Sequence, residues 1–370
     1  MKKIDLITPC ILVDGDILNN NILEYQKISD TNGKELWPMT KTHKSTEIAK
    51  MQIDAGAKGL LAGTLDECEA FCEMGIENIM YAYPVASEPN LQRAVNLAKK
   101  CNFIIRIDCQ EAAKLINEAA KNADIVMNYS LIIDSGLHRF GVLPENAVSV
   151  ANAISEFTSL NLVGISSHPG HVYGALSHSD LQKYVDDEKS SMKYAADALR
   201  AAGYDLKIVS SGSTPTFRGA VDDETIMVYH PGNYVFNDVI QLSTDTARDC
   251  DCALTIYATI ISQPRESLMI IDAGTKCFGL DQGAHGNTAI VGFGKVKGHP
   301  EAIVDSLSEE VGKIKISEET TLKVGDKIEI IPNHSCVPAN QTSYLVACKG
   351  DVVDRFINVD IRANSKKPII

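Results

Sequence analysis

The sequence has no long apolar run, no low-complexity tract and no excess of positive charge. None of its apolar stretches approaches the length of a membrane span, and the opening residues lack the apolar core of a signal peptide. With 48 acidic residues against 35 Lys and Arg, the net charge is -13, which argues against nucleic acid or an anionic membrane as a partner. We therefore expect a cytoplasmic protein that binds neither.

The cysteines do not form the pattern of a disulfide framework. Ten of them are scattered through apolar segments, as in Cys10-Ile11-Leu12-Val13, which is typical of reduced, buried thiols. Cys250 and Cys252 flank an aspartate with no histidine near them in the sequence, so we interpret this pair as structural. The length of 370 residues, with 45% hydrophobic content, predicts a barrel-sized domain and a smaller second one.

Short apolar runs alternate with amphipathic stretches through the first two thirds of the chain. The stretches at 46–55, 65–74, 110–121 and 179–202 have helical spacing, and Gly56, Gly75 and Gly203 follow three of them. Strands that alternate with helices pair in parallel, and eight repeats predict an α/β fold closed into a (β/α)8 TIM-like barrel. The predicted strands are Glu35–Pro38, Gly59–Ala62, Asn78–Pro84, Asn102–Asp108, Ser130–Asp134, Leu162–His168, Lys207–Ser211 and Ile226–His230.

After about Tyr234 the long helical stretches stop, and β-branched or alternating runs follow one another. This pattern predicts a mostly antiparallel β domain, which we expect the early apolar run at 9–13 to join. We therefore divide the chain into an N-terminal strand at 1–14, a barrel at 15–240 and a C-terminal β domain at 241–370. The predicted strands of this domain are Thr255–Ile261, Leu268–Ile271, Ala289–Gly298, Lys327–Pro332 and Tyr344–Cys348.

A lysine after the first strand and two glycine-rich loops carry the predicted chemistry. Lys41 and Lys44 stand where a barrel strand runs into its loop, and barrels of this kind keep their active sites at such strand ends. A lysine that loses its proton there can form a Schiff base with pyridoxal phosphate. The loops at 210–215 and 230–234 follow strands seven and eight, and their hydroxyl and N–H groups could bind a phosphate. Solvated lysines and ordinary turns are the alternative.

His334 and Cys336 form a second candidate site in the β domain. Two residues apart on an extended segment, they would point the same way and could reach one ion. Imidazole plus thiolate is a ligand pair of the zinc type, and two protein ligands leave positions open for water and substrate. A histidine and a buried cysteine without any metal is the alternative interpretation.

Taken together, the motifs resemble the fold-type III pyridoxal-phosphate enzymes, and among them the D-threonine aldolase and D-serine dehydratase family. The similarity runs nearly end to end. It rests on Thr8-Pro9, Lys41-Thr42-His43-Lys44, His138-Arg139-Phe140-Gly141, Ser211-Gly212-Ser213-Thr214-Pro215, His230-Pro231-Gly232-Asn233-Tyr234 and Pro332-Asn333-His334-Ser335-Cys336.

The resemblance implies a role for each of these motifs. Lys41 would carry the pyridoxal phosphate, and Arg139 and Tyr173 would lie beside its ring. Gly212, Ser213, Thr214, Gly232 and Asn233 would form the phosphate cup. His334 and Cys336 would hold a divalent metal, zinc or manganese with magnesium as a further option. Catalysis would use Lys41 on the α-proton and, for aldol cleavage, a metal-bound water or a histidine such as His171 on the substrate hydroxyl.

The substrate implied by the resemblance is a small D-3-hydroxy amino acid, and two lyase reactions remain open. Cysteine at position 336 is typical of the dehydratases, whereas the segments 272–274, 283–286 and 299–301 look more like the bacterial aldolases. We favour a D-threonine aldolase, with a D-serine or D-threo-3-hydroxyaspartate dehydratase as the alternative. An amino-acid racemase or a pyridoxal-phosphate carrier protein is a further alternative. A homodimer is expected from the resemblance.

Overall fold

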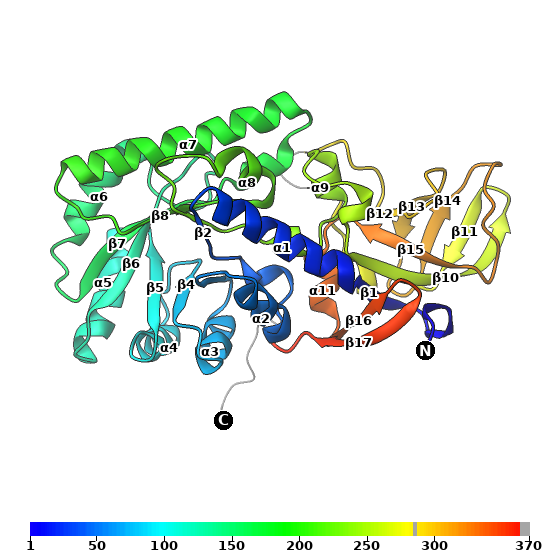
Figure 1. Cartoon of the computed structure of the whole chain (residues 1–370), viewed down its shortest axis with the longest axis horizontal. Helices are drawn as coiled ribbons and strands as arrows, with labels where there is room; N and C mark the ends of the chain where they lie inside the picture. The colour runs from blue at the N-terminus through cyan, green and yellow to red at the C-terminus, as the bar shows by residue number, and fades with distance from the viewer. Residues whose placement is uncertain (284–286, 363–370) are drawn as a thin grey trace.

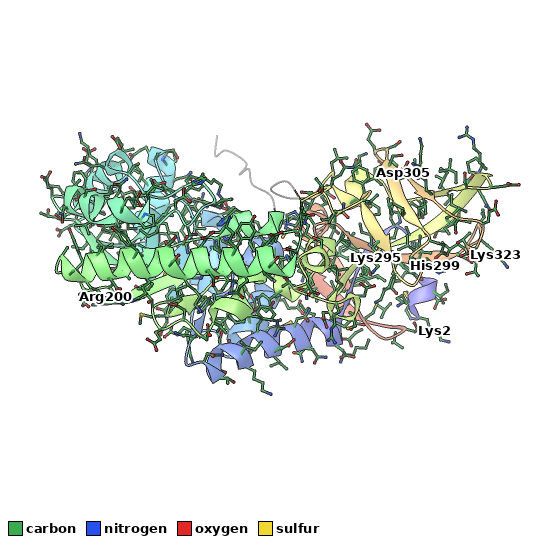
Figure 2. All side chains as sticks on the ribbon, turned by 90° about the horizontal axis from the view of Figure 1, so that it is seen from above. Lys2, Arg200, Lys295, His299, Asp305 and Lys323 are labelled. Atoms are coloured by element: carbon green, nitrogen blue, oxygen red, sulfur yellow. The ribbon has the colours of Figure 1, made fainter. Side chains whose placement is uncertain are left out.

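The computed structural model describes residues 1–283 and 287–362, which form a parallel barrel and a second, mostly antiparallel sheet (Figure 1). In Figure 1 the barrel lies on the left and the β domain on the right, with helix α1 (Gly15–Thr31) running across their junction. Figure 2 shows the same division from above, with Arg200 near one end of the molecule and His299 and Asp305 on the β domain. No helix in the described part of the chain could span a membrane.

The barrel is built from eight parallel strands, as the sequence predicts. Their order in the sheet is β2-β9-β8-β7-β6-β5-β4-β3, and a parallel bridge between Met39 and Leu61 joins the two ends. All eight predicted strands are present, although the first and last have only two residues each. The strands are β2 (Glu35–Leu36), β3 (Leu60–Ala62), β4 (Asn78–Tyr81), β5 (Asn102–Ile107), β6 (Met127–Ile132), β7 (Leu160–Ser166), β8 (Ile208–Ser211) and β9 (Val228–Tyr229).

The helices begin at side-chain caps and several end at glycines in left-handed conformation. Ser45, Thr64 and Ser213 each accept a hydrogen bond from a main-chain N–H of the helix that follows. Gly56 and Gly75 have positive φ angles, as expected for residues that end helices. After α1 the helices are α2 (Thr46–Asp54), α3 (Leu65–Glu73), α4 (Glu88–Ala98), α5 (Gln110–Asn122), α6 (Ala147–Ile154), α7 (His178–Ala201), α8 (Thr214–Ala220), α9 (Val239–Ser243), α10 (Thr275–Phe278) and α11 (Cys336–Gln341). Short 3-10 helices are η1 (Lys3–Asp5), η2 (Thr40–Thr42), η3 (Pro144–Asn146), η4 (Gly170–Gly174), η5 (Asn233–Val235) and η6 (Asp249–Asp251).

Inside the barrel, a small apolar cluster is topped by polar side chains. Along β5, Phe103 and Ile105 pack against the helices, whereas Ile104 belongs to the interior cluster, which also contains Trp37 and Met80. Because strand side chains alternate, Arg106 points inward like Ile104 but nearer the carboxyl end of the strand. The chain therefore has an apolar barrel interior with a charged layer above it.

At the opposite end of the barrel, asparagine side chains form a hydrogen-bonded ladder across four neighbouring strands. The amide of Asn161 donates to Asn128, that of Asn128 to Asn102 and that of Asn102 to Asn78, at distances of 2.9, 3.3 and 2.8 Å. The ladder ties β7, β6, β5 and β4 together near their N-terminal ends, away from the pocket described below.

The second sheet has nine strands, and the early strand β1 (Cys10–Asp14) lies in it. β1 pairs antiparallel with β10 and parallel with β16, so the expected pairing of the first apolar run is present. The order of the strands is β11-β14-β13-β12-β15-β10-β1-β16-β17. Their bounds are β10 (Leu254–Arg265), β11 (Leu268–Ile271), β12 (Gly294–Val296), β13 (Ile303–Leu307), β14 (Gly312–Lys315), β15 (Lys327–Pro332), β16 (Tyr344–Lys349) and β17 (Val352–Asn358).

Candidate active site

A single pocket at the carboxyl ends of the barrel strands collects most of the predicted site residues. Its walls come from the loops after β2, β8 and β9 and from the segment after β15 of the second sheet. The predicted residues that line it are Lys41, Arg139, Tyr173, Gly212, Ser213, Gly232, Asn233, His334 and Cys336. Thr214 and His171 are not part of the lining.

Lys41 and Lys44 have different surroundings, although both are in or next to η2. Lys44 is buried, and its Nζ lies 2.7 Å from Oε2 of Glu67, a side chain with no exposed surface. The other oxygen of Glu67 accepts a hydrogen bond of 2.7 Å from Thr40, so this carboxylate is fully engaged. Lys41 instead lines the pocket, where Gly63 leaves room for it: a Cβ at that glycine would lie 2.9 Å from Lys41 Cβ. The geometry therefore favours Lys41 for chemistry and Lys44 for structure.

The two glycine-rich loops meet at the start of α8. Gly212 has φ of +134°, and a Cβ there would lie 3.0 Å from the main-chain nitrogen of His230, so the close approach of the loops requires glycine. The Oγ of Ser213 caps α8, and Thr214 Oγ1 accepts a 3.1 Å hydrogen bond from the N–H of Tyr234. Thr214 thus joins one loop to the other from behind the pocket, and the first N–H groups of α8 have no acceptor within the helix.

Two histidines that were not predicted as site residues line the pocket. Burial lowers the pKa of His168 well below its usual value, and the positive charge of Lys41 lowers it further. Burial also lowers the pKa of His230 to about 3. The Nδ1 of His230 lies 2.8 Å from the carbonyl oxygen of Trp37, which can only accept, so Nδ1 carries the proton and Nε2 is an acceptor. His168 and His230 follow β7 and β9, and this placement at strand ends could have indicated from the sequence that they belong to the site.

His171 lies outside the pocket lining, and its role beside the substrate stays a prediction. It is part of η4, and its ring packs edge-on against Tyr184 of α7, with the ring centroids 4.9 Å apart. Within the same 3-10 turn at 170–174, Tyr173 lines the pocket and His171 does not. His168, three residues earlier, occupies the pocket-facing position instead.

His334 and Cys336 interact directly. The prediction that they lie on an extended segment is wrong. β15 ends at Pro332, Ser335 is in helical conformation and Cys336 opens α11. Burial would lower the pKa of His334, but the neighbouring Cys336 thiolate and a 3.3 Å contact with Asp281 raise it. Burial likewise opposes ionisation of Cys336, but His334 and a hydrogen bond with Thr42 bring its pKa below the usual value.

Asp238 joins this pair to the phosphate loops, and sequence reasoning missed it. Its Oδ2 accepts hydrogen bonds of 2.6 Å from Asn233 Nδ2 and 2.8 Å from the N–H of Ser335. Burial raises the pKa of its carboxyl group. Asp238 is the N-cap of α9, and an aspartate before a helix is common, so nothing in the sequence pointed to a role in the site.

The residues of the pocket fit both pyridoxal phosphate and a divalent metal, the two groups that the sequence implies. For pyridoxal phosphate, the pocket offers Lys41 and an anion cradle at the start of α8. It also contains buried acceptors, His230 Nε2 and Asn233 Oδ1, that have no hydrogen-bond partner among the described residues. For a metal, it offers a thiolate and an imidazole whose Nδ1 faces Asp281, the arrangement that orients histidine ligands. Among the described residues, no further Asp, Glu, His or Cys completes a three-ligand cluster.

Two family models match successive parts of the chain. Residues 13–238 match the family described as alanine racemase, N-terminal domain, and residues 253–348 match the putative serine dehydratase domain. The chain belongs to the alanine racemase N-terminal domain family. The family members are fold-type III pyridoxal-phosphate enzymes, and the fold and the relatives together imply this cofactor.

Curated relatives cover nearly the whole chain. D-threo-3-hydroxyaspartate dehydratase of Delftia sp. (strain HT23) is 29% identical over 353 residues, covering 91% of this chain and 92% of that protein. D-serine dehydratase of Dictyostelium discoideum is also 29% identical, covering 90% and 91%. D-threonine aldolase of Arthrobacter sp. is 22% identical, covering 97% and 93%.

Solved structures give the same result. A histidine-to-alanine variant of D-threo-3-hydroxyaspartate dehydratase has a TM-score of 0.90 at 27% identity, covering 97% of this chain and 96% of that one. A cysteine-to-alanine variant of the same enzyme in the metal-free form also has a TM-score of 0.90, at 28% identity, covering 97% and 99%.

Proposed function

We propose that the chain is a lyase that uses pyridoxal phosphate and a divalent metal to act on D-3-hydroxy amino acids. The observation that carries this proposal is that Lys41, the anion cradle at α8 and the His334–Cys336 pair line one pocket. A racemase needs a second base and no metal pair, and a carrier needs neither. The dehydratases and the aldolase among the relatives support the lyase class.

Each side chain has a definite task in this proposal. Bound pyridoxal phosphate would supply an electron sink for negative charge at the substrate α-carbon. Lys41 would attach the cofactor and then take the α-proton through its Nζ. Gly212, Ser213, Thr214, Gly232 and Asn233 would hold the phosphate, and Arg139 and Tyr173 would flank the ring. His168, kept neutral, is placed to accept a proton within the pocket.

His334 and Cys336 are the residues that would hold the divalent metal, and Asp281 would fix the orientation of the imidazole. A divalent ion there would supply Lewis acidity toward the substrate hydroxyl, and a thiolate–imidazole pair favours zinc over manganese or magnesium. The two variants of D-threo-3-hydroxyaspartate dehydratase named above lend support, because the replaced histidine and cysteine are two residues apart, as His334 and Cys336 are.

Of the two lyase reactions, dehydration is the one that the pocket supports best. It breaks the Cα–H and Cβ–O bonds and releases water, giving a 2-oxo acid and ammonia after hydrolysis, and it uses Lys41 as the base. Aldol cleavage, the favoured prediction from the sequence, needs a base for the hydroxyl, and His171 lies outside the pocket lining. Aldol cleavage remains the second candidate because His168 lines the pocket and the aldolase relative spans 97% of the chain.

The test is a product assay. The protein, reconstituted with pyridoxal phosphate and zinc or manganese, is incubated with D-serine, D-threonine and D-threo-3-hydroxyaspartate. Formation of a 2-oxo acid with ammonia identifies the dehydratase, and formation of glycine with an aldehyde or glyoxylate identifies the aldolase. Inversion of D- to L-amino acids with neither product would overturn the lyase proposal. A Lys41→Ala control should be inactive with every substrate.

We further propose that the enzyme works as a homodimer in the cytoplasm. The support for a dimer is the resemblance to the family, since most soluble oligomers are symmetric homo-oligomers and dimers are the commonest of them. Light scattering of the purified protein should give twice the chain mass of 40.2 kDa. A monomeric mass at the working concentration would count against this part of the proposal.

A further inference from the structure

One positive charge in the pocket has no negative partner among the residues that the structure describes. Arg106 is 3% exposed, and its Nε contacts the sulfur of Met80 at 3.2 Å. Its Nη2 is buried and without a hydrogen-bond partner among the described residues. Burial lowers the pKa of the guanidinium, and the nearby charge of Arg139 lowers it further. A buried cation left in this way is unfavourable unless something else compensates for it.

The pocket offers no carboxylate to compensate Arg106. The described residues that line it include Lys41, Arg106 and Arg139 and no Asp or Glu, and the Cys336 thiol is already paired with His334. Asp134 lies in a small adjoining pocket that Arg106 also lines, but its carboxylate accepts hydrogen bonds from the N–H groups of Gly136 and His138. It also contacts the His138 ring, 2.9 Å away. The missing negative charge must therefore come from a ligand.

The phosphate of a bound cofactor is served by a different part of the pocket. The anion cradle lies after β8 and β9, whereas Arg106 is on β5, several strands away in the sheet. On β5 it faces the barrel interior just above Ile104, at the floor of the pocket. A ligand anchored by its phosphate at α8 would therefore need a second anionic group on the side of β5.

We propose that Arg106 binds an anionic oxygen of the ligand in this pocket, either a carboxylate of the substrate or the phenolate of the cofactor ring. This inference rests on the proposed function for the identity of the ligand. The need for an anion rests on the pocket alone. Charge-assisted hydrogen bonds from a planar guanidinium are of the kind that recognises such oxygens.

The first test measures the stability of the cofactor-free protein. Arg106→Met keeps the length of the side chain and removes the charge, so thermal unfolding of the cofactor-free variant should occur at the same or a higher temperature than in the unchanged protein. The matched control is Arg93→Met, because Arg93 is bound to Glu69 by two hydrogen bonds of 2.7 and 2.8 Å and should lose stability when truncated. This arm does not depend on any enzymatic activity. Destabilisation by Arg106→Met equal to that of Arg93→Met would overturn the proposal.

The second test measures ligand affinity and distinguishes the two sources of the oxygen. If the cofactor phenolate is the partner, Arg106→Met should weaken pyridoxal phosphate about 10- to 100-fold, and an analogue without the 3-hydroxyl should bind both proteins equally. If the substrate carboxylate is the partner, cofactor affinity should stay the same. D-serine should then bind about 10- to 100-fold more weakly, and serinol, which has no carboxylate, should bind equally.

Arg106→Lys keeps the charge and should restore part of the lost affinity in either case. Unchanged affinity for both the cofactor and D-serine in Arg106→Met would overturn the proposal. A failure of Lys41 to bind the cofactor in the unchanged protein would instead count against the proposed function. The stability comparison of Arg106→Met with Arg93→Met would remain valid in that event.

Discussion

At the scale of single residues, the pocket separates groups that are held in place from groups that remain available. Lys44, Glu67 and Thr40 bind one another in the interior, whereas Lys41 faces the cavity. The resemblance assigned the cofactor to Lys41, and the position of Glu67, more than twenty residues away, gives an independent reason to separate the two lysines. The sequence was a limited guide for His168 and His171. His168 lines the pocket and His171, inside the 3-10 turn that follows, does not, and no spacing rule predicts this difference.

Replacing each lysine in turn should give opposite results. Lys41→Ala should abolish the absorption band of the lysine-bound cofactor and leave the free energy of unfolding nearly unchanged. Lys44→Ala should lower the free energy of unfolding by about 3–5 kcal/mol, because it leaves the Glu67 carboxylate buried without its partner. Absorption spectra and urea unfolding measure the two effects. If Lys44→Ala removes the band and Lys41→Ala retains it, the assignment is reversed.

At the scale of secondary structure, helix α7 places a buried carboxyl group next to the phosphate loops. Among the described residues, no Lys or Arg forms an ion pair with it. Glu188 of α7 has no exposed surface and faces Ser211 at the end of β8 and Thr216 of α8. Burial, with a smaller contribution from Asp223, raises its pKa to about 7, against the lowering effect of the Ser211 and Thr216 hydroxyls and of the nearby Lys189. The elements themselves followed well from the sequence, since long amphipathic helices such as α7 and buried strands such as β5 have clear periodicity.

The strands that escaped prediction are short or exposed. β14 has only four residues, and β17 lies at the edge of its sheet with most of its side chains exposed. β12 covers only three residues of the run predicted at 289–298. The fold of such strands depends on partners distant in sequence, which local patterns do not contain. Residues 284–286 of the aldolase-like segment at 283–286 lie outside the described residues.

The raised pKa of Glu188 predicts a pH-dependent stability. An unfolded glutamate has a pKa of about 4.3, so the folded protein binds more protons, and its stability falls as the pH rises from about 4 to 7. Glu188→Gln removes this effect. Relative to the unchanged protein, the variant should gain stability between about pH 4.5 and pH 8, by an amount on the order of 3 kcal/mol.

Urea unfolding at the two pH values measures this gain. Glu118→Gln on the exposed face of α5 is the control and should show no such pH-dependent difference. An equal effect of Glu188→Gln at both pH values would contradict the prediction.

At the scale of the whole molecule, the candidate metal pair lies where the two sheets meet. His334 and Cys336 follow β15 of the second sheet, and Cys336 contacts Thr42 and Asn233 of the barrel. Two protein ligands are too few for a closed structural site, and a core of this size does not need a metal to fold. We therefore expect the metal to serve the reaction and not the fold. The three-part division of the chain at 14/15 and 240/241 stays a prediction.

Removal of the metal tests this expectation. Chelation should abolish turnover while the midpoint of thermal unfolding changes by no more than about 2 °C, which corresponds to about 1.5 kcal/mol for a protein of this size. Added zinc or manganese should restore activity. Cofactor absorption should persist throughout, since attachment to Lys41 does not require a Lewis acid. A large fall in the unfolding midpoint on chelation would instead assign the metal a structural role.

The placement of β1 has a consequence for the order in which the molecule can be completed. Its nearest partner in sequence, Leu254, pairs with Val13, and its other neighbour, β16, is almost a hundred residues further along. At roughly 5–20 residues per second, a ribosome needs about 10–50 s to deliver β10 after β1 has emerged. During that interval the barrel sequence is already synthesised, while an apolar strand with two open edges waits beside it. The last sheet to close therefore contains the first strand to be made, and the nascent chain is most exposed to misassociation at its own beginning.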